Sequence, residues 1–344
     1  MGILKKLLIL LVILITMLLL TYLYNERIKI MKTLQDYETM QTMDDTSNDA
    51  NKNSELMRLE SLPIPSISNA RFNNDLPLRE YVVKGAYNAA FTGNYVNTEM
   101  IRHVLLRGCR FLDFEIYSVD KKPFVGFSNT TTFSKIESKN KFALADALQT
   151  INDHAFQSPT PNMHDPLFLH IRVKTDEDGL TKSIAQSIEE NLRSRLYQGA
   201  INGTTKISKL IGKVVIVFDT SLAKFDDSSK KVVNIESNSD NLRLYRNMYI
   251  TNKKIDPVYV KDDGISTDVE KYQIVLPDTG GDFYGRKRNP KSHVLVKDYG
   301  IQIICCAFYN QDSELNKFEK LFGEHRSAFV PLASAVHYIE KMEE

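Results

Sequence analysis

Two carboxylates stand at alternate positions in residues 110–117, a segment that reads as a buried strand. Side chains two residues apart in a strand point to the same side, so Asp113 and Glu115 share one face. Carboxylate oxygens suit Ca²⁺, and they also pair with arginine. A second apolar segment, 166–173, carries His170 and Arg172 at the same spacing. The spacing therefore predicts two polar pairs, each presented to one face of a sheet.

Residues 78–117 as a whole resemble the opening of a phosphoinositide-specific phospholipase C catalytic domain of the X/Y-box, phospholipase C-like phosphodiesterase superfamily. That family begins with a strand, a small-small-His-Asn run and a Thr-Gly. A helix then leads into a strand that carries two acids, here Asp113 and Glu115. The resemblance continues through 212–219 and 300–323 and covers roughly 76–340. It implies an α/β fold, a TIM-like (β/α)8 barrel.

The alternation of strand and helix patterns agrees with such a barrel. The predicted strands are 81–86, 110–117, 166–173, 213–219 and 301–308, and the predicted helices are 97–107, 141–154, 180–196 and 313–321.

The resemblance also implies a reaction that this chain is poorly equipped to perform. The family uses two histidines, a calcium ion and basic residues around the ring phosphates to cleave a phosphodiester. Tyr87 stands at the first histidine, and Phe127, or a residue beside it, stands at the second. A phenol with a pKa near 10 is a poor base at neutral pH, and a phenyl ring has no proton to give. We therefore expect a catalytic site without its intact acid and base.

Three of the family's calcium ligands are matched, by Asn88, Asp113 and Glu115, but Arg172 replaces the fourth. Arg172 could act in place of the metal, as in the metal-independent bacterial members, or it could be a buried ion pair left from a lost metal site. We favour the ion pair because buried charges are normally kept paired. We expect no cofactor and no calcium. His170 is interpreted as a hydrogen-bonded core residue, with a displaced catalyst as the alternative.

The family's phosphate-binding positions are also altered. Val217 and Asp219 stand where two lysines would hold the ring phosphates, and a carboxylate repels a polyanionic headgroup. A basic segment, Arg286, Lys287 and Arg288, lies where the family has a substrate loop. It is a weak phosphate-binding candidate, and a solvated surface is the slightly favoured alternative.

The composition is that of an ordinary folded protein. Its 344 residues are 25% charged with a formal net charge of +1, so no bulk electrostatic attraction to nucleic acid is expected. The three cysteines include the adjacent Cys305 and Cys306, which is not a disulfide framework and suits a reducing compartment.

Residues 1–24 read as an uncleaved transmembrane signal anchor. The 18 residues from Leu7 to Tyr24 contain no charge, glycine or proline. A cleaved signal peptide is the alternative, but no small-x-small site follows. The flanking lysines and arginines only slightly favour a cytoplasmic barrel. The lysine-, asparagine- and isoleucine-rich composition would suit a protein of a viral membrane.

The remaining chain divides into a stalk with a disordered linker at 25–72 and a barrel at 73–344. The barrel has a first half at 76–220, a short junction at 221–240 and a second half at 241–340. We expect a membrane-anchored, catalytically inactive barrel kept for binding or structure. The alternative is an active, metal-independent phosphodiesterase with rearranged catalytic residues. Expected partners are the membrane and a lipid headgroup or protein at the barrel mouth, with no nucleic acid; the sequence does not give the oligomeric state.

Overall fold

A computed structural model describes residues 16–17, 21–22, 54–72, 75–226, 229–250, 272–280 and 288–343. The chain divides into two compact units, residues 1–53 and 54–344. Among the described residues, no helix is long and apolar enough to span a membrane. The anchor expected at 1–24 lies outside the described residues except at positions 16–17 and 21–22.

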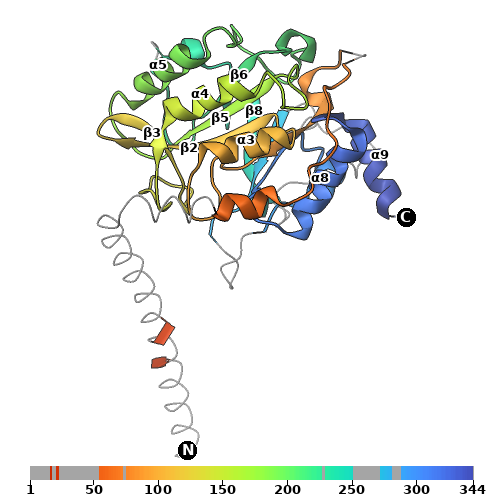
Figure 1. Cartoon of the computed structure of the whole chain (residues 1–344), viewed down its shortest axis with the longest axis horizontal. Helices are drawn as coiled ribbons and strands as arrows, with labels where there is room; N and C mark the ends of the chain where they lie inside the picture. The colour runs from red at the N-terminus through yellow and green to blue at the C-terminus, as the bar shows by residue number, and fades with distance from the viewer. Residues whose placement is uncertain are drawn as a thin grey trace, which may run out of the picture. The chain divides into compact units, whose positions relative to one another are not determined.

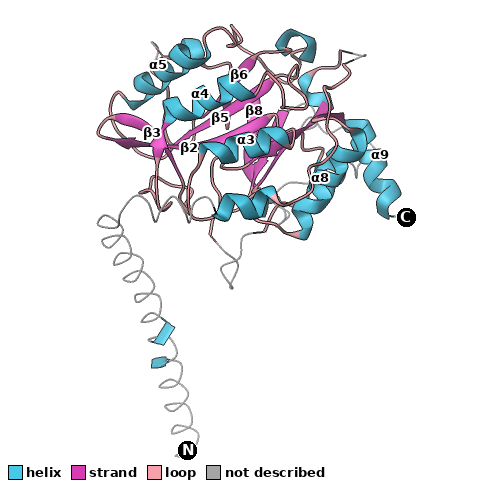
Figure 2. Cartoon of the chain, in the orientation of Figure 1, coloured by secondary structure: helices cyan, strands magenta, loops and turns pink. Residues whose placement is uncertain are grey.

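The second unit is built on eight parallel strands that follow one another around a nearly closed barrel (Figures 1 and 2). Their order is β7-β6-β5-β2-β1-β10-β9-β8, so β7 and β8 form the two ends. The expected TIM-like α/β barrel is thus confirmed. The strands are β1 (Tyr81–Ala86), β2 (Phe111–Val119), β5 (Leu167–Val173), β6 (Val214–Asp219), β7 (Ile235–Ser237), β8 (Leu242–Arg246), β9 (Tyr272–Leu276) and β10 (Ile303–Cys306).

Helices lie outside the strands, as Figure 2 shows for α3, α4, α5 and α8. Side-chain caps fix where two of them begin: Asn97 accepts from the Glu99 N–H at 3.0 Å, and Asp312 accepts from the Leu315 N–H at 2.8 Å. The helices are α3 (Thr98–Leu106), α4 (Leu144–His154), α5 (Leu180–Leu192), α6 (Asn247–Tyr249), α7 (Ser292–Tyr299), α8 (Ser313–His325) and α9 (Leu332–Glu343), with 3₁₀ turns η1 (Leu78–Glu80), η2 (Ile207–Leu210) and η3 (Lys230–Val232).

Three further strands modify the barrel. β3 (Lys122–Gly126) forms a hairpin with β2 and also pairs with β4 (Phe142–Ala143). β11 (Phe329–Pro331) pairs antiparallel with the first half of β1, and β2 pairs with the second half. β1 also approaches β10 so closely at Gly85 that a Cβ there would lie 2.8 Å from the Ile304 carbonyl oxygen. A side chain at this position would push the two strands apart.

Residues 54–72, which we assigned to the stalk, instead pack against the barrel. Residues 54–60 form a helix, and Leu59 is fully buried. Glu55 accepts hydrogen bonds from the Thr92 hydroxyl at 2.6 Å and from the Asn94 N–H at 3.2 Å. Further along, the Ala70 N–H donates to Asp165 at 2.8 Å. The boundary at 72 is therefore too late, because apolar burial and hydrogen bonds hold this segment from residue 54 onward.

Candidate functional site

The two predicted polar pairs face each other on neighbouring parallel strands. In the register of β2 and β5, Asp113 lies beside His170 and Glu115 lies beside Arg172. Arg172 is the penultimate residue of β5, and Leu112, next to Asp113, pairs with Ala86 at the carboxyl end of β1. The cluster therefore lies at the end of the barrel where TIM barrels carry their functional groups. Asn88 is the second residue after β1, and its φ of 43° lies in the left-handed region that asparagine tolerates. The structure thus brings the predicted residues together at one end of the barrel.

The Arg172 guanidinium is the centre of this cluster. Its Nε and Nη2 donate to the two oxygens of Asp113 at 2.7 and 2.6 Å. Its Nη1 donates to Glu115 Oε1 at 2.9 Å, and Nη2 also reaches Asn88 Oδ1 at 3.2 Å. None of the four side chains is more than 3% exposed. We call Asn88, Asp113, Glu115 and Arg172 the ionic core.

Backbone and hydroxyl donors use the remaining carboxylate oxygens. Glu115 Oε2 accepts from the Tyr117 hydroxyl at 2.9 Å and from the Ser128 N–H at 2.8 Å. Asp113 Oδ2 accepts from the Asn88 N–H at 3.0 Å. Burial alone would raise the pKa of Asp113, but the charge of Arg172 and the contacts with His170 and Arg172 outweigh it and hold that pKa below its usual range.

His170 lies inside the barrel and is fully buried. Its Nδ1 is 2.8 Å from Asp113 Oδ1, and its Nε2 is 2.9 Å from the Ser237 hydroxyl oxygen. Because an ionised carboxylate only accepts hydrogen bonds, Nδ1 carries the proton. Both ring nitrogens are therefore engaged by protein groups, as expected of a core histidine.

Tyr87 is almost fully buried between two arginines. Arg172 and Arg246 lie 5.1 and 5.9 Å from its ring centroid, a cation–π arrangement. Burial raises the pKa of Tyr87 above its ordinary value, although both arginines act in the opposite direction. The phenol is therefore protonated at neutral pH and is not a base.

Phe127 belongs to an aromatic cluster beside the ionic core. Its ring stacks on Phe91 with centroids 3.9 Å apart, and Tyr309 meets Phe91 edge to face at 4.8 Å. Phe91 and Phe127 are both buried, with exposed fractions of 4% and 5%. The cluster gives this part of the mouth an apolar wall without a titrating group.

The calcium ion that the resemblance implies does not fit these residues. Ca²⁺ takes six to eight oxygen ligands. The four carboxylate oxygens of Asp113 and Glu115 and the amide oxygen of Asn88 already accept hydrogen bonds from protein donors. All three side chains also accept hydrogen bonds from Arg172, whose positive charge opposes a second cation at the same point.

Comparison with known proteins agrees with this architecture. Residues 74–218 match the family described as phosphatidylinositol-specific phospholipase C, X domain. This match covers the first half of the barrel and less than half of the chain. A comparison with curated proteins gave no match.

Two solved structures extend the similarity over most of the chain. PLC21 of S. officinalis has a TM-score of 0.61 at 16% identity, covering 82% of this chain and 40% of that protein. PLC21 of L. pealei has a TM-score of 0.60 at 16% identity, covering 78% of this chain and 39% of that protein. This chain therefore spans about two fifths of these relatives' length, and likeness at this identity shows the fold alone.

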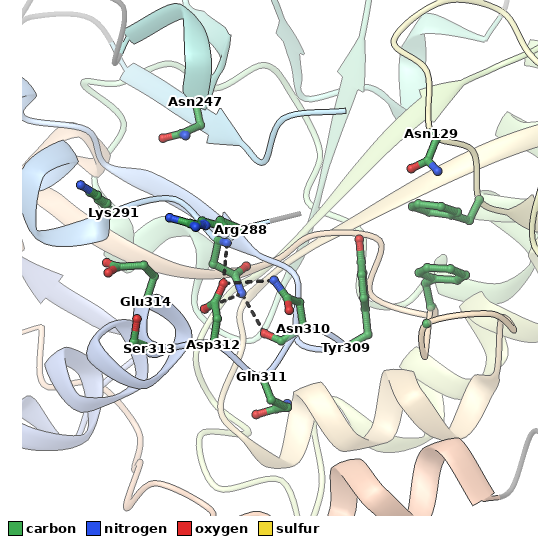
Figure 3. Close-up of a pocket in the computed structure, with 14 residues that line it drawn as sticks. Asn129, Asn247, Arg288, Lys291, Tyr309, Asn310, Gln311, Asp312, Ser313 and Glu314 are labelled. Carbon is green, nitrogen blue, oxygen red and sulfur yellow. Dashed lines mark hydrogen bonds between the residues drawn. The ribbon is translucent and has the colours of Figure 1, made fainter. Parts of the chain in front are cut away.

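A large cavity lies at the mouth between loops of the first half of the barrel and segments of the second half. Its volume is about 890 Å³, within the range of ligand pockets. Figure 3 shows Arg288, Lys291 and Glu314 on one side and Asn129 and Tyr309 on the other. The lining residues are Phe91, Gly93, Phe127, Asn129, Asn247, Arg288, Asn289, Lys291 and 309–314. No member of the ionic core lines this cavity. We call it the mouth cavity.

The predicted phosphate-binding residues are only partly described. Arg286 and Lys287 lie outside the described residues, whereas Arg288 is exposed and lines the mouth cavity. Val217 and Asp219 lie on β6. Asp219 accepts from the Ser221 N–H at 2.9 Å.

Several polar residues of the mouth did not stand out in the sequence. Lys174 continues the alternation of His170 and Arg172, is buried, and donates to the Thr130 carbonyl at 2.7 Å. Burial lowers the pKa of Lys174 to about 8. The period-two pattern of β5 could have identified Lys174. By contrast, Arg246 is the last residue of the short strand β8 in the weakly matched second half, where we predicted no strand from the sequence.

Proposed function

We propose that this chain is a phospholipase C-like barrel that binds a ligand at its mouth without cleaving a phosphodiester. Hydrolysis of this kind requires a base for the attacking hydroxyl and an acid for the leaving group. The resemblance places Tyr87 and Phe127 where the family has histidines. One is a buried, protonated phenol and the other is a phenyl ring.

The main support for the proposal is the burial and hydrogen bonding of His170, the histidine nearest the ionic core. His170 is fully buried, and Asp113 and Ser237 occupy its two ring nitrogens. The other six histidines lie on outer helices or, for His164, in the loop before β5. A catalytic imidazole must reach the substrate within hydrogen-bond distance. None of these positions supports that role.

The alternative function is a metal-independent phosphodiesterase that uses Arg172 as its cation. A guanidinium can stabilise developing negative charge when it is free to meet the substrate. Here Arg172 is 2% exposed and already donates to Asn88, Asp113 and Glu115. We therefore favour a structural role for this residue.

The test is release of inositol phosphate from vesicles containing radiolabelled phosphatidylinositol, with the purified full-length chain. We expect release at the background rate. The double variant Tyr87→His, Phe127→His should partly restore release, because it returns two imidazoles to a retained scaffold. Tyr87→Phe with Phe127→Leu is the matched control, since it alters both positions without adding an imidazole. Wild-type turnover of about 1 s⁻¹ or faster, abolished by Arg172→Ala, would establish the enzyme instead.

We further propose that residues 1–24 attach the barrel to a membrane, with the barrel on the cytoplasmic side. The support is the uncharged apolar run from Leu7 to Tyr24 and the slight excess of basic residues after it, at Arg27, Lys29 and Lys32. Alkaline extraction and protease protection of the expressed chain test this. Release of the barrel by alkali would contradict anchoring, and protection of the barrel inside sealed microsomes would contradict the orientation.

A further inference from the structure

The end of the barrel opposite the mouth carries a continuous strip of cations. The chain before β1 crosses this end, where the strands begin. Its Ser68 N–H donates to the Arg326 carbonyl at 3.1 Å, and its Asn69 side chain accepts from the His164 N–H at 2.8 Å. Arg326, Arg71 and His164 therefore come from segments that lie side by side at the amino ends of the strands.

Three more cations continue the strip beside His164. The Gly212 N–H donates to the His164 carbonyl at 2.9 Å, which brings the turn with Lys209 and Lys213 next to it. Arg195 follows, because its carbonyl accepts from the first N–H of β6 at 2.8 Å. We call this set the basic strip: Arg71, His164, Arg195, Lys209, Lys213 and Arg326.

The acids that the structure describes do not offset the charge of the basic strip. Within the described part of the chain, none of its lysines and arginines makes an ion pair. Lys213 is half-buried and the other members are exposed. Two acids belong to the same segments, but Asp75 pairs with Lys206 at 3.4 Å and Asp165 is buried. Glu324, close to the last member of the strip in sequence, is an exposed acid at its edge.

This gathering of charge opposes itself, because like charges at one end of a protein repel one another. Arg195 and Arg326 follow α5 and α8, where a cation offsets the negative end of the helix dipole. Arg71, Lys209 and Lys213 do not stand at the end of an α-helix. An anionic partner would relieve the repulsion among all of these charges.

An exposed apolar side chain narrows the class of partner. Ile211 lies between Lys209 and Lys213 and is 45% exposed. The nearby ring of Phe72 packs edge to face against two other rings, so it offers no platform on which nucleic-acid bases could stack. A single isoleucine also buries little apolar area in a lipid surface. An acidic polypeptide that carries an apolar side chain matches both the charge and Ile211.

We propose that the basic strip binds an acidic segment of a partner protein: a peptide rich in aspartate and glutamate that carries an apolar side chain. Its carboxylates pair with the cations of the strip, and its apolar side chain packs on Ile211. Exposed ion pairs of this kind give modest affinity that falls with salt. The strip lies at the opposite end of the barrel from the mouth cavity, so the inference does not depend on the proposed function.

The test is fluorescence anisotropy of a labelled peptide titrated with the purified full-length chain. The probe is a short peptide of glutamate and serine with one central leucine. It should bind with a Kd of about 10 µM to 1 mM at low ionic strength, and about tenfold more weakly in about 0.5 M salt. Replacing every glutamate by glutamine should abolish binding, and replacing the leucine by serine should weaken it several-fold.

Variants of the chain then locate the binding. Arg71→Glu and Lys209→Glu should each weaken it about tenfold, because each turns an attraction into a repulsion. Ile211→Ser should weaken it several-fold without changing its salt dependence. Lys182→Glu is the matched control: it makes the same charge change at an exposed position of α5, which begins at the mouth end of the barrel. This control should bind like wild type, and all four variants should keep the wild-type thermal midpoint.

The inference is overturned if the glutamine peptide binds as tightly as the glutamate peptide, if no acidic peptide binds, or if Arg71→Glu and Lys209→Glu together leave the affinity unchanged. Labelled single-stranded and duplex DNA are titrated in parallel, and tighter binding of either would assign a nucleic acid instead. Co-flotation with phosphatidylserine and phosphatidylcholine vesicles tests the lipid surface. A preference for phosphatidylserine that the double variant loses, without binding of the acidic peptide, would assign a membrane instead.

Discussion

Arg172 and Asp113 form a two-point ion pair inside the barrel, with guanidinium N–H groups 2.7 and 2.6 Å from the two carboxylate oxygens. The same guanidinium also bonds Glu115 and Asn88, so one side chain gathers three groups that could otherwise hold a metal. A bound metal can dissociate from its ligands, whereas Arg172 is covalently part of β5. The positive charge of the ionic core is therefore always present in the folded barrel.

The first prediction concerns stability. Arg172→Met should destabilise the barrel by about 3–5 kcal/mol, because it leaves two buried carboxylates without their cation. Arg102→Met is the matched control: Arg102 pairs with Glu99 at 2.6 Å, but both side chains are more than 40% exposed. That pair should contribute less than about 1 kcal/mol. The measurement is urea unfolding, and similar losses for the two variants would show that the ionic core is not a stabilising element.

The second prediction concerns calcium. Wild-type protein should show no calcium binding by titration and no change in thermal midpoint with calcium or chelator. Arg172→Glu should be destabilised without calcium, since it adds a third buried acid, and should regain part of its midpoint when calcium is added. Magnesium is the control ion, because it demands a tighter octahedral site. Micromolar calcium binding by the wild type, lost in Asp113→Ala, would contradict our interpretation of Arg172.

The ionic core was predictable because the spacing of its residues within two short strand segments shows which side chains share a face. Asp113 and Glu115 share one face of a strand, as do His170 and Arg172, and the apolar runs around them gave both strands to within about two residues. Parallel pairing of β2 with β5 then places the two pairs side by side. Fold and core followed from periodicity and family resemblance together.

The mouth cavity could not be predicted in the same way. Its residues come from loops that meet only when the barrel closes, with 309–314 lying beside Phe91 and Phe127. The segment at 54–72 was misassigned because its sequence mixes polar and apolar residues and contains two prolines, while its burial depends on a few positions such as Leu59. Contacts between residues far apart in the sequence produce no periodic pattern of apolar residues from which they could be predicted.

The third prediction tests whether this segment stabilises the barrel. Leu59→Ala should cost about 2–5 kcal/mol, because Leu59 is fully buried and its removal leaves a cavity. Met57→Ala is the matched control on the same helix, since Met57 is 69% exposed and should change stability by less than about 0.5 kcal/mol. Both are measured by urea unfolding of the full-length chain. Equal, small effects would mean that residues 54–60 do not pack as described.

The last prediction concerns Asp165, which accepts a hydrogen bond from the Ala70 N–H near the carboxyl end of the segment 54–72. Asp165 is 1% exposed, and burial raises its pKa to about 6, although the Ala70 N–H and the charge of Arg110 act in the opposite direction. A raised carboxyl pKa means that the folded state binds the proton more tightly than the unfolded state. Its ionisation therefore destabilises the fold above pH 6, by about 2–3 kcal/mol, and this penalty disappears as the pH falls below about 4.

Asp165→Asn keeps the acceptor for Ala70 and removes the charge. The variant should be about 2–3 kcal/mol more stable than wild type at pH 8, and the difference should vanish near pH 4. The measurement is the difference in unfolding free energy between variant and wild type at both pH values, which cancels the titration of all other groups. Asp178→Asn, at an exposed position, is the control and should show a small difference at both. If Asp165→Asn instead loses stability at pH 8, then the Asp165 carboxylate is a stabilising partner of Arg110 and not a buried charge tolerated at a cost.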